Sequence, residues 1–283
     1  MPECIRPRRI EMWEFFNENI DAAGSWRLGK LTDLSAGDRK AAEFFIAALK
    51  GSRRVLDLGC GAGLPGLYLA EHVGSLVGLD AAPNMIAAAR TNAAELGLPN
   101  ALFQVGGLDA LPFEDEGFDG ASLCGVLESM DWEDVHRTIS EVWRVLQASG
   151  RLAVLAQDWQ DVVHRRPRQE TSVRFEKGRL WLQTTERKVS LPGERDTRYY
   201  VAPESTSGRR LRQELAGEMR HLTTLSADQL LPEDIVDAWF YETAQFDTET
   251  LAALLESSGF HTVMVSRERI WTSPTLLATA RKR

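Results

Sequence analysis

The chain has 283 residues, of which 43% are hydrophobic and 26% are charged, a composition typical of a folded globular protein. Its formal net charge of −8 argues against nucleic-acid binding, which usually requires a basic excess. Three cysteines without C-x-x-C spacing argue against a cysteine-rich metal site, and no apolar stretch has the length of a membrane span, so we expect a soluble cytoplasmic protein with no metal and no membrane contact.

The first fifty residues predict helices. Large apolar side chains recur at helical spacing over residues 7–24, and a second apolar face follows over residues 35–51. Ser35 or Asp38 would cap the start of this second helix. We expect residues 1–50 to form an N-terminal helical cap.

From residue 53 onward, short apolar runs alternate with helical segments. The predicted strands are 53–59, 75–80, 101–106, 118–127 and 151–157, and the predicted helices between them are 65–73, 82–97 and 133–150. This alternation predicts an α/β fold with a doubly wound, mostly parallel sheet. Such sheets bind their ligands at the carboxyl ends of the strands.

The alternation stops after about residue 158 and resumes near the end of the chain. Period-two patterning around Glu-Lys-Gly predicts a hairpin over 172–191, residues 197–202 predict another strand, and a polar, mostly helical stretch follows up to residue 246. A helix over 247–260 and strands over 261–271 and 275–282 close the chain. We therefore expect the ligand-binding core at 51–160, an inserted antiparallel β/α lid over the substrate at 161–245, and completion of the core sheet at 246–283.

The loop after the first predicted strand carries two overlapping patterns. "GAGLPG" (61–66) fits G-x-G-x-x-G, which in dinucleotide-binding folds holds a pyrophosphate at a helix N-terminus. "DLGCGAG" (57–63) overlaps it and begins with Asp57, a carboxylate that a pyrophosphate site does not need. Asp80 ends the second strand, where a carboxylate accepts hydrogen bonds from ribose hydroxyls in either kind of nucleotide site. These residues alone leave both kinds of site open.

A longer series of motifs resembles the class I S-adenosylmethionine-dependent methyltransferases, in the small-molecule branch that includes ubiquinone/menaquinone-type enzymes. The motifs are "VLDLGCGAG", "VGLDAAPNMIAAAR", "LPFEDEGFDGASLCGVLESM", "EVWRVLQASGRLAVL" and "LLESSGF". The resemblance covers about residues 52–160 and 246–283. It implies a Rossmann-like seven-stranded sheet with a C-terminal antiparallel strand, S-adenosyl-L-methionine as the cofactor and S-adenosyl-L-homocysteine as the product.

The resemblance also implies which residues hold the cofactor. The amino-acid part would lie on Asp57, Gly59, Cys60, Gly61 and Gly63, the ribose on Asp80, and the adenine beside Ala81 and Met85, with Cys124 at the end of the fourth strand. Members of the family often have Gly-Asp after the third strand, where this chain has Gly106-Gly107, so Leu108 and Asp109 become the candidates beside the adenine. A family histidine after the fourth strand is replaced by Ser129, which removes a general base from that position.

Catalysis and the substrate leave fewer signals. His164 is the best-placed general base if the acceptor needs one, although a solvent-facing loop histidine is the favoured alternative. Residues 161–220 contain 14 Lys and Arg against 9 Asp and Glu, which favours an anionic or aromatic substrate. Candidate substrate-wall residues are Trp13, Trp26, Tyr199, Trp239 and Tyr241, with ordinary packing as the alternative role for each.

We therefore expect a methyltransferase that moves a methyl group to an O, N or C atom of a small, aromatic or anionic molecule. The alternatives are an RNA or protein methyltransferase, an NAD-dependent oxidoreductase, and a protein that uses the cofactor fold for non-methyl chemistry. "SLCGVL" stands where methyltransferases of nucleic-acid bases carry an Asn/Asp-Pro-Pro-aromatic motif, which argues against the first. A homodimer is an open possibility.

Overall fold

The computed structural model describes residues 27–130, 132–158, 170–176, 179–186, 196–202, 237–244, 246–271 and 273–283. The chain divides into two compact units. One comprises Met12–His164 and Ala244–Arg283, and the other comprises Met1–Glu11 and Arg165–Thr243.

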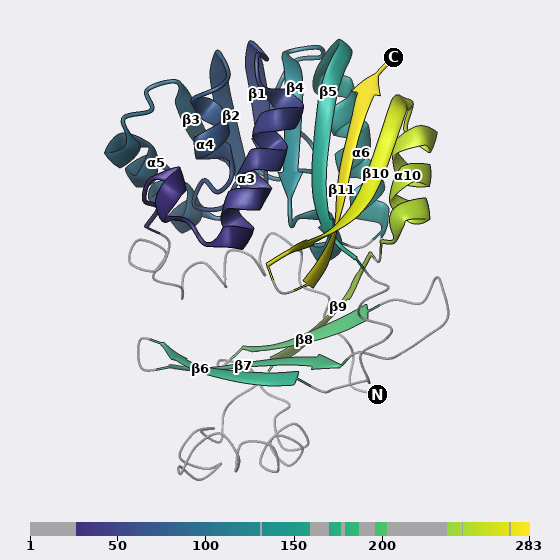
Figure 1. Ribbon diagram of the computed structural model, residues 1–283. Coiled ribbons are helices and arrows are strands. Elements are labelled where there is room, and N and C mark those ends of the chain that lie inside the picture. Colours follow the sequence, from purple (N-terminus) through teal and green to yellow (C-terminus); the bar gives the residue numbers. More distant parts are fainter. Residues whose placement is uncertain are drawn as a thin grey trace. The chain divides into compact units, whose positions relative to one another are not determined.

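The first unit contains a seven-stranded sheet (Figure 1). Its strands are β1 (Arg54–Leu58), β2 (Ser75–Asp80), β3 (Ala101–Val105), β4 (Phe118–Cys124), β5 (Leu146–Gln157), β10 (Phe260–Ile270) and β11 (Ser273–Lys282). They lie in the order β10-β11-β5-β4-β1-β2-β3. β1 to β5 pair in parallel, and β11 runs antiparallel to both β5 and β10. This arrangement confirms the predicted Rossmann-like sheet with a C-terminal antiparallel strand.

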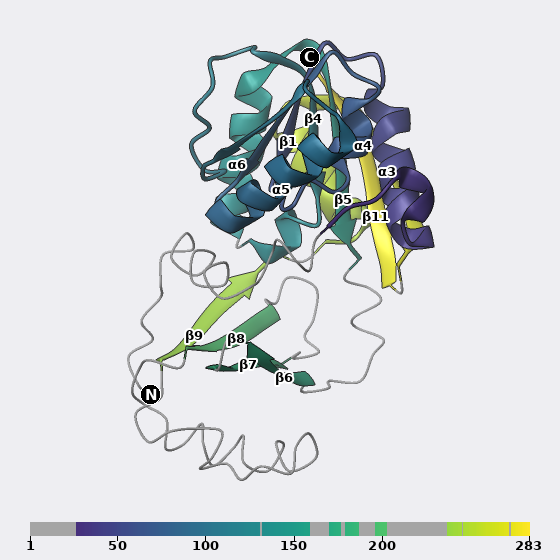
Figure 2. The ribbon, with the colours of Figure 1, turned by 90° about the vertical axis from the view of Figure 1, so that its left-hand side faces the viewer.

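Helices cover both faces of this sheet (Figure 2). They are α3 (Ala36–Leu49), α4 (Gly66–Ala70), α5 (Pro83–Leu96), α6 (Trp132–Val145) and α10 (Thr248–Ser257), with 3-10 turns η1 (Leu31–Asp33) and η2 (Leu127–Ser129). Buried side chains of α3, α4 and α5 form one apolar core, and those of α6 and α10 form a second. No helix in the described part of the chain combines the length and the apolar character needed to cross a membrane.

Local sequence signals explain most helix boundaries. The Ser35 hydroxyl accepts a hydrogen bond from the Asp38 N–H at 3.1 Å, which confirms the predicted cap of α3. Gly97 ends α5 in a left-handed conformation, with φ of 70°. The predicted helix over 133–150 was wrong at its end, because α6 stops at Val145 and Leu146 already pairs with Phe118 of β4.

The second unit contains a four-stranded antiparallel sheet in the order β6-β7-β8-β9. Its strands are β6 (Glu170–Glu176), β7 (Arg179–Glu186), β8 (Asp196–Ala202) and β9 (Asp237–Thr243). The β6–β7 hairpin and β8 confirm the predicted strands. The mostly helical expectation up to residue 246 was wrong over β9, which pairs with β8 along its whole length because cross-strand pairing outweighs local propensity.

Candidate functional site

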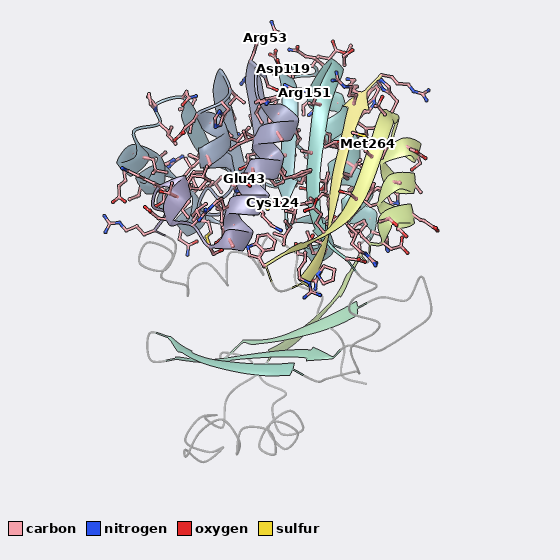
Figure 3. All side chains as sticks on the ribbon, in the orientation of Figure 1. Glu43, Arg53, Asp119, Cys124, Arg151 and Met264 are labelled. Atoms are coloured by element: carbon pink, nitrogen blue, oxygen red, sulfur yellow. The ribbon has the colours of Figure 1, made fainter. Side chains whose placement is uncertain are left out.

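The predicted cofactor residues gather at the carboxyl edge of the seven-stranded sheet. They follow the ends of four strands that lie side by side in the sheet, in the order β4-β1-β2-β3. Figure 3 shows Cys124 toward this edge, whereas Arg53, Asp119 and Arg151 lie at the opposite edge. A ligand site at this edge is the arrangement expected for a doubly wound sheet.

The glycine loop after β1 adopts a backbone that only glycine takes without strain. Gly59, Gly61 and Gly63 have φ angles of 64°, 51° and 106°. A Cβ on Gly59 or on Gly63 would lie 2.5 Å from a neighbouring side chain, that of Val126 or of Leu67 respectively. A Cβ on Gly61 would meet nothing within 4 Å. Packing therefore requires the outer two glycines, while Gly61 leaves its backbone open to a ligand.

Asp80 fixes this loop to the start of α5. Its Oδ2 accepts a hydrogen bond from the Gly61 N–H at 2.8 Å, and its Oδ1 accepts one from the Ala82 N–H at 3.0 Å. Burial raises the pKa of the Asp80 carboxyl, although these two backbone hydrogen bonds act in the opposite direction. An ionised carboxylate has about four acceptor positions, and these two hydrogen bonds use two of them.

Asp57 is a buried carboxylate at this edge, with only 1% of its surface exposed. Its Oδ1 accepts a hydrogen bond from the Ser122 hydroxyl at 2.7 Å. Its Oδ2 is buried and has no hydrogen-bond partner among the described residues. Burial raises the pKa of Asp57 to about 7, and the nearby Asp80 charge adds to this effect while the Ser122 hydroxyl opposes it. A buried carboxylate oxygen without a donor is the feature expected where a cationic ligand group binds.

Gly66 has a role that the dinucleotide fingerprint does not describe. It is the first residue of α4, one residue after the predicted start of this helix, and Pro65 stands at the N-cap position. A Cβ on Gly66 would overlap the Oδ2 atom of Asp57. The last glycine of "GAGLPG" therefore makes room for a carboxylate of the protein.

The two cysteines at the edge have unreactive thiols. Cys60 is buried, and its Sγ lies beside Gly78 of β2. Burial raises the pKa of the Cys60 and Cys124 thiols well above the ordinary value, and the Asp57 charge adds to both shifts. A thiol that stays protonated is a poor nucleophile.

The residues predicted beside the adenine surround the ends of β2 and β3. Met85 packs against the small cluster formed by Ala62 of the glycine loop and Ala88 of α5. The Gly106 N–H donates to the Asp80 carbonyl oxygen at 2.9 Å, which holds the end of β3 beside the predicted ribose residue. Ala81 and Leu108 are half-buried and Asp109 is exposed. The structure thus brings these residues to the same edge as Asp57 and Asp80.

A contact that sequence reasoning missed joins the segment before α3 to the glycine loop. The Asn92 amide donates to the Ala62 carbonyl at 2.9 Å, and its Oδ1 accepts from the Leu28 N–H at 3.1 Å. The Tyr68 hydroxyl donates to the Gly29 carbonyl at 2.7 Å. Burial raises the pKa of Tyr68 to about 12, so it remains a donor. The only sequence signal was the polar Asn92 beside the alanines of this helix.

The structure does not describe the side chains of the remaining predicted residues. His164, Trp13 and Trp26 fall outside the described residues. Tyr199 lies in β8, and Trp239 and Tyr241 lie in β9, but the description of these strands covers their backbone only. Their roles stay predictions. Within the described ranges, no three His, Cys, Asp or Glu side chains are grouped to hold a metal ion.

Ser129 stands where the resemblance predicts a histidine, and its hydroxyl makes a hydrogen bond within its own turn. It donates to the Val126 carbonyl oxygen at 2.6 Å inside η2.

Comparison with known proteins agrees with this geometry. Residues 55–150 match a family model described as "Methyltransferase domain". Over 112 residues the chain is 37% identical to demethylmenaquinone methyltransferase of Thermus thermophilus. The matched region covers 39% of this chain and 50% of that protein. The chain spans half or less of the length of the first curated relatives that it matches.

Solved structures share the fold at low identity. One is 1,6-didemethyltoxoflavin-N1-methyltransferase of Burkholderia thailandensis, crystallised with 1,6-didemethyltoxoflavin and S-adenosylhomocysteine, with a TM-score of 0.56, 18% identity, and coverage of 96% of this chain and 87% of that chain. The [4+2]-cyclase SpnF has a TM-score of 0.51 and 19% identity, with coverage of 87% and 81%. The fold therefore occurs with more than one chemistry.

Proposed function

We propose that this chain, whose residues 55–150 match a methyltransferase family model, is an S-adenosylmethionine-dependent methyltransferase acting on a small molecule. The observation that carries the proposal is the Oδ2 atom of Asp57, which is buried at the glycine loop without a hydrogen-bond partner among the described residues. An α-ammonium group would satisfy this oxygen, whereas a pyrophosphate would be repelled by it.

The other residues at the edge fit the remaining parts of this cofactor. The open face of Gly61 would receive the amino-acid part, together with the backbone of Gly59, Cys60 and Gly63. The free acceptor positions of Asp80 suit the ribose hydroxyls. The half-buried side chains of Met85 and Leu108 suit the faces of an adenine ring, with Ala81 and Asp109 at its edge.

The demands of the chemistry on the protein are modest. When bound, the cofactor supplies a methyl group that its sulfonium has already activated. The protein must hold the acceptor atom in line with that methyl group and exclude water. A hydroxyl or carbon acid also needs a base, for which we propose His164, while an unprotonated amine does not.

We propose an aromatic or anionic small molecule as the methyl acceptor, at an O, N or C atom. The basic excess of residues 161–220 and the aromatic residues Tyr199, Trp239 and Tyr241 support this class. The names of the relatives add support, since they include a demethylmenaquinone methyltransferase. The acidic chain as a whole disfavours an RNA substrate. A homodimer stays a prediction.

Thermal unfolding and product formation test the proposal together. We expect S-adenosylmethionine and S-adenosylhomocysteine to raise the melting temperature, while NAD does not, because only a ligand that binds the folded state stabilises it. Incubation with a panel of quinols, phenols and aromatic amines should then give S-adenosylhomocysteine with at least one of them, detected by mass spectrometry. Stabilisation without turnover on any acceptor class would favour the non-methyl chemistry of the cyclase type.

A further inference from the structure

Ser122 is a buried hydroxyl in the middle of an apolar strand. It lies on β4 directly opposite Asp57 of β1 in the parallel register, and its own exposure is 1%. The hydroxyl donates to Asp57 Oδ1 at 2.7 Å. Its strand neighbours Ala121 and Leu123 are completely buried apolar residues. A buried hydroxyl among apolar neighbours needs a hydrogen-bond partner, and Asp57 supplies it.

We propose that Ser122 is a positioning residue that orients the Asp57 carboxylate and favours its ionised form, with Oδ2 directed to the α-ammonium of the cofactor. The inference rests on the proposed function. It goes beyond that function because Ser122, a residue of the sheet interior that would not touch the cofactor, would influence cofactor affinity through Asp57.

The surroundings of Asp57 show why it depends on one hydroxyl. Gly66 leaves no side chain over Oδ2, and the loop residue Cys60 and the β4 residue Cys124 present neutral thiols. Asp80, on β2, adds a negative charge. The Ser122 hydroxyl is the interaction that lowers the pKa of Asp57 against burial and against the Asp80 charge. Without it, the carboxyl would remain protonated to a higher pH and be free to rotate.

This arrangement links cofactor binding to a proton. In the free protein the pKa of Asp57 is about 7, so near pH 6 the carboxyl is mostly protonated. Binding an ammonium group favours the ionised form and releases that proton. Affinity should therefore rise with pH from 6 to 7.5. Removing the Ser122 hydroxyl should move this rise to higher pH, because it raises the pKa of Asp57 further.

The test is isothermal titration calorimetry with S-adenosylhomocysteine, which carries the α-ammonium without the sulfonium. Measurement between pH 5.5 and 7.5 stays below the pKa of about 8 of an ordinary α-amino group. Buffers of different ionisation enthalpy report the protons released. The variants are Ser122→Ala, Ser122→Thr, Asp57→Asn and, as a matched control, Ser52→Ala. Ser52 is an equally buried serine at the opposite edge of the sheet, and its hydroxyl contacts Arg151.

For the wild type we expect release of most of one proton at pH 6 and affinity rising on the order of tenfold by pH 7.5. Ser122→Ala should bind at least about fivefold more weakly at pH 7, with its pH midpoint moved upward, and Ser122→Thr should restore both. Asp57→Asn should release no proton at pH 6. Ser52→Ala should lower the melting temperature while leaving affinity and its pH profile unchanged.

Two failures are distinguishable. Absence of any S-adenosylhomocysteine binding by the wild type would contradict the proposed function. Binding by the wild type with the same affinity and the same proton release in Ser122→Ala would overturn the role of Ser122 alone. If Ser122→Thr does not fold, the comparison of Ser122→Ala with Ser52→Ala still decides between positioning and a merely structural role.

Discussion

Gly61 and Gly51 provide a matched pair that separates backbone strain from ligand contact. Both have positive φ, 51° and 80°, and a Cβ on either would meet nothing within 4 Å. Alanine at either position should cost about 1 kcal/mol of unfolding free energy, because each forces a left-handed backbone. Only Gly61→Ala should also weaken S-adenosylmethionine binding, measured by calorimetry. Equal affinities of the two variants would remove Gly61 from the cofactor site.

Asp80 gives the second prediction for a single residue. Asp80→Ala removes the acceptors of two backbone N–H groups and the proposed ribose partner. Binding of S-adenosylmethionine should therefore weaken by roughly 2 kcal/mol. Asp80→Asn should lose less, since an amide oxygen still accepts one of these hydrogen bonds. Cofactor affinity unchanged in Asp80→Ala would place the ribose elsewhere.

At the residue scale the sequence predicted the residues of the glycine loop but not the buried hydrogen bond between Ser122 and Asp57. The pattern "DLGCGAG" and the position of Asp80 predicted which residues meet at the carboxyl edge. The role of Ser122 could not be predicted, because its contact with Asp57 depends on the register between β1 and β4. The two residues are 65 positions apart in the chain. A lone serine in an apolar run was the only signal.

At the element scale, two residues of α6 hold the loop between β3 and β4. Glu141 accepts a hydrogen bond from the Leu111 N–H at 2.8 Å. Arg144 donates to the Leu111 carbonyl at 3.0 Å and to the Phe113 carbonyl at 2.8 Å, and it also pairs with Asp115 at 2.7 Å. Helix α6 thereby fixes the backbone that leads from the predicted adenine residues into β4.

Arg144→Lys should loosen this loop, because an ammonium group cannot reach several acceptors in a plane as a guanidinium does. We expect a loss of about 2 kcal/mol in unfolding free energy and faster amide exchange over 111–115, measured by hydrogen-exchange mass spectrometry. Arg137→Lys is a suitable control, since Arg137 pairs only with exposed or partly exposed acids of its own helix in the described contacts. Unchanged exchange in Arg144→Lys would contradict the clamp.

The elements that sequence patterns missed are those set by distant pairing. Helix periodicity continues through residues 146–150, but Leu146 joins the sheet by pairing with Phe118. In the second unit, β9 forms against β8 across more than thirty intervening residues, which no local pattern specifies. The strands of the first sheet were predictable because each is a short apolar run between turn signals.

At the scale of the whole molecule, Asp57 should make stability depend on pH. Its folded-state pKa of about 7 lies above the value of about 4 for an unfolded chain, so its contribution is fully present below pH 4 and is lost as pH rises through 7. Asp57→Asn removes this loss. In urea unfolding of the ligand-free protein, the variant should therefore gain stability relative to the wild type between pH 5 and pH 7.5. A difference that does not change with pH would mean that Asp57 is not buried as an acid.

The central claim is that the glycine loop holds S-adenosylmethionine and not a dinucleotide. Calorimetric titration of the full chain with S-adenosylmethionine and, separately, with NAD tests it most directly. We predict binding of S-adenosylmethionine at a single site, weakened in Gly61→Ala, and no heat of binding with NAD. Binding of NAD without binding of S-adenosylmethionine would contradict the account.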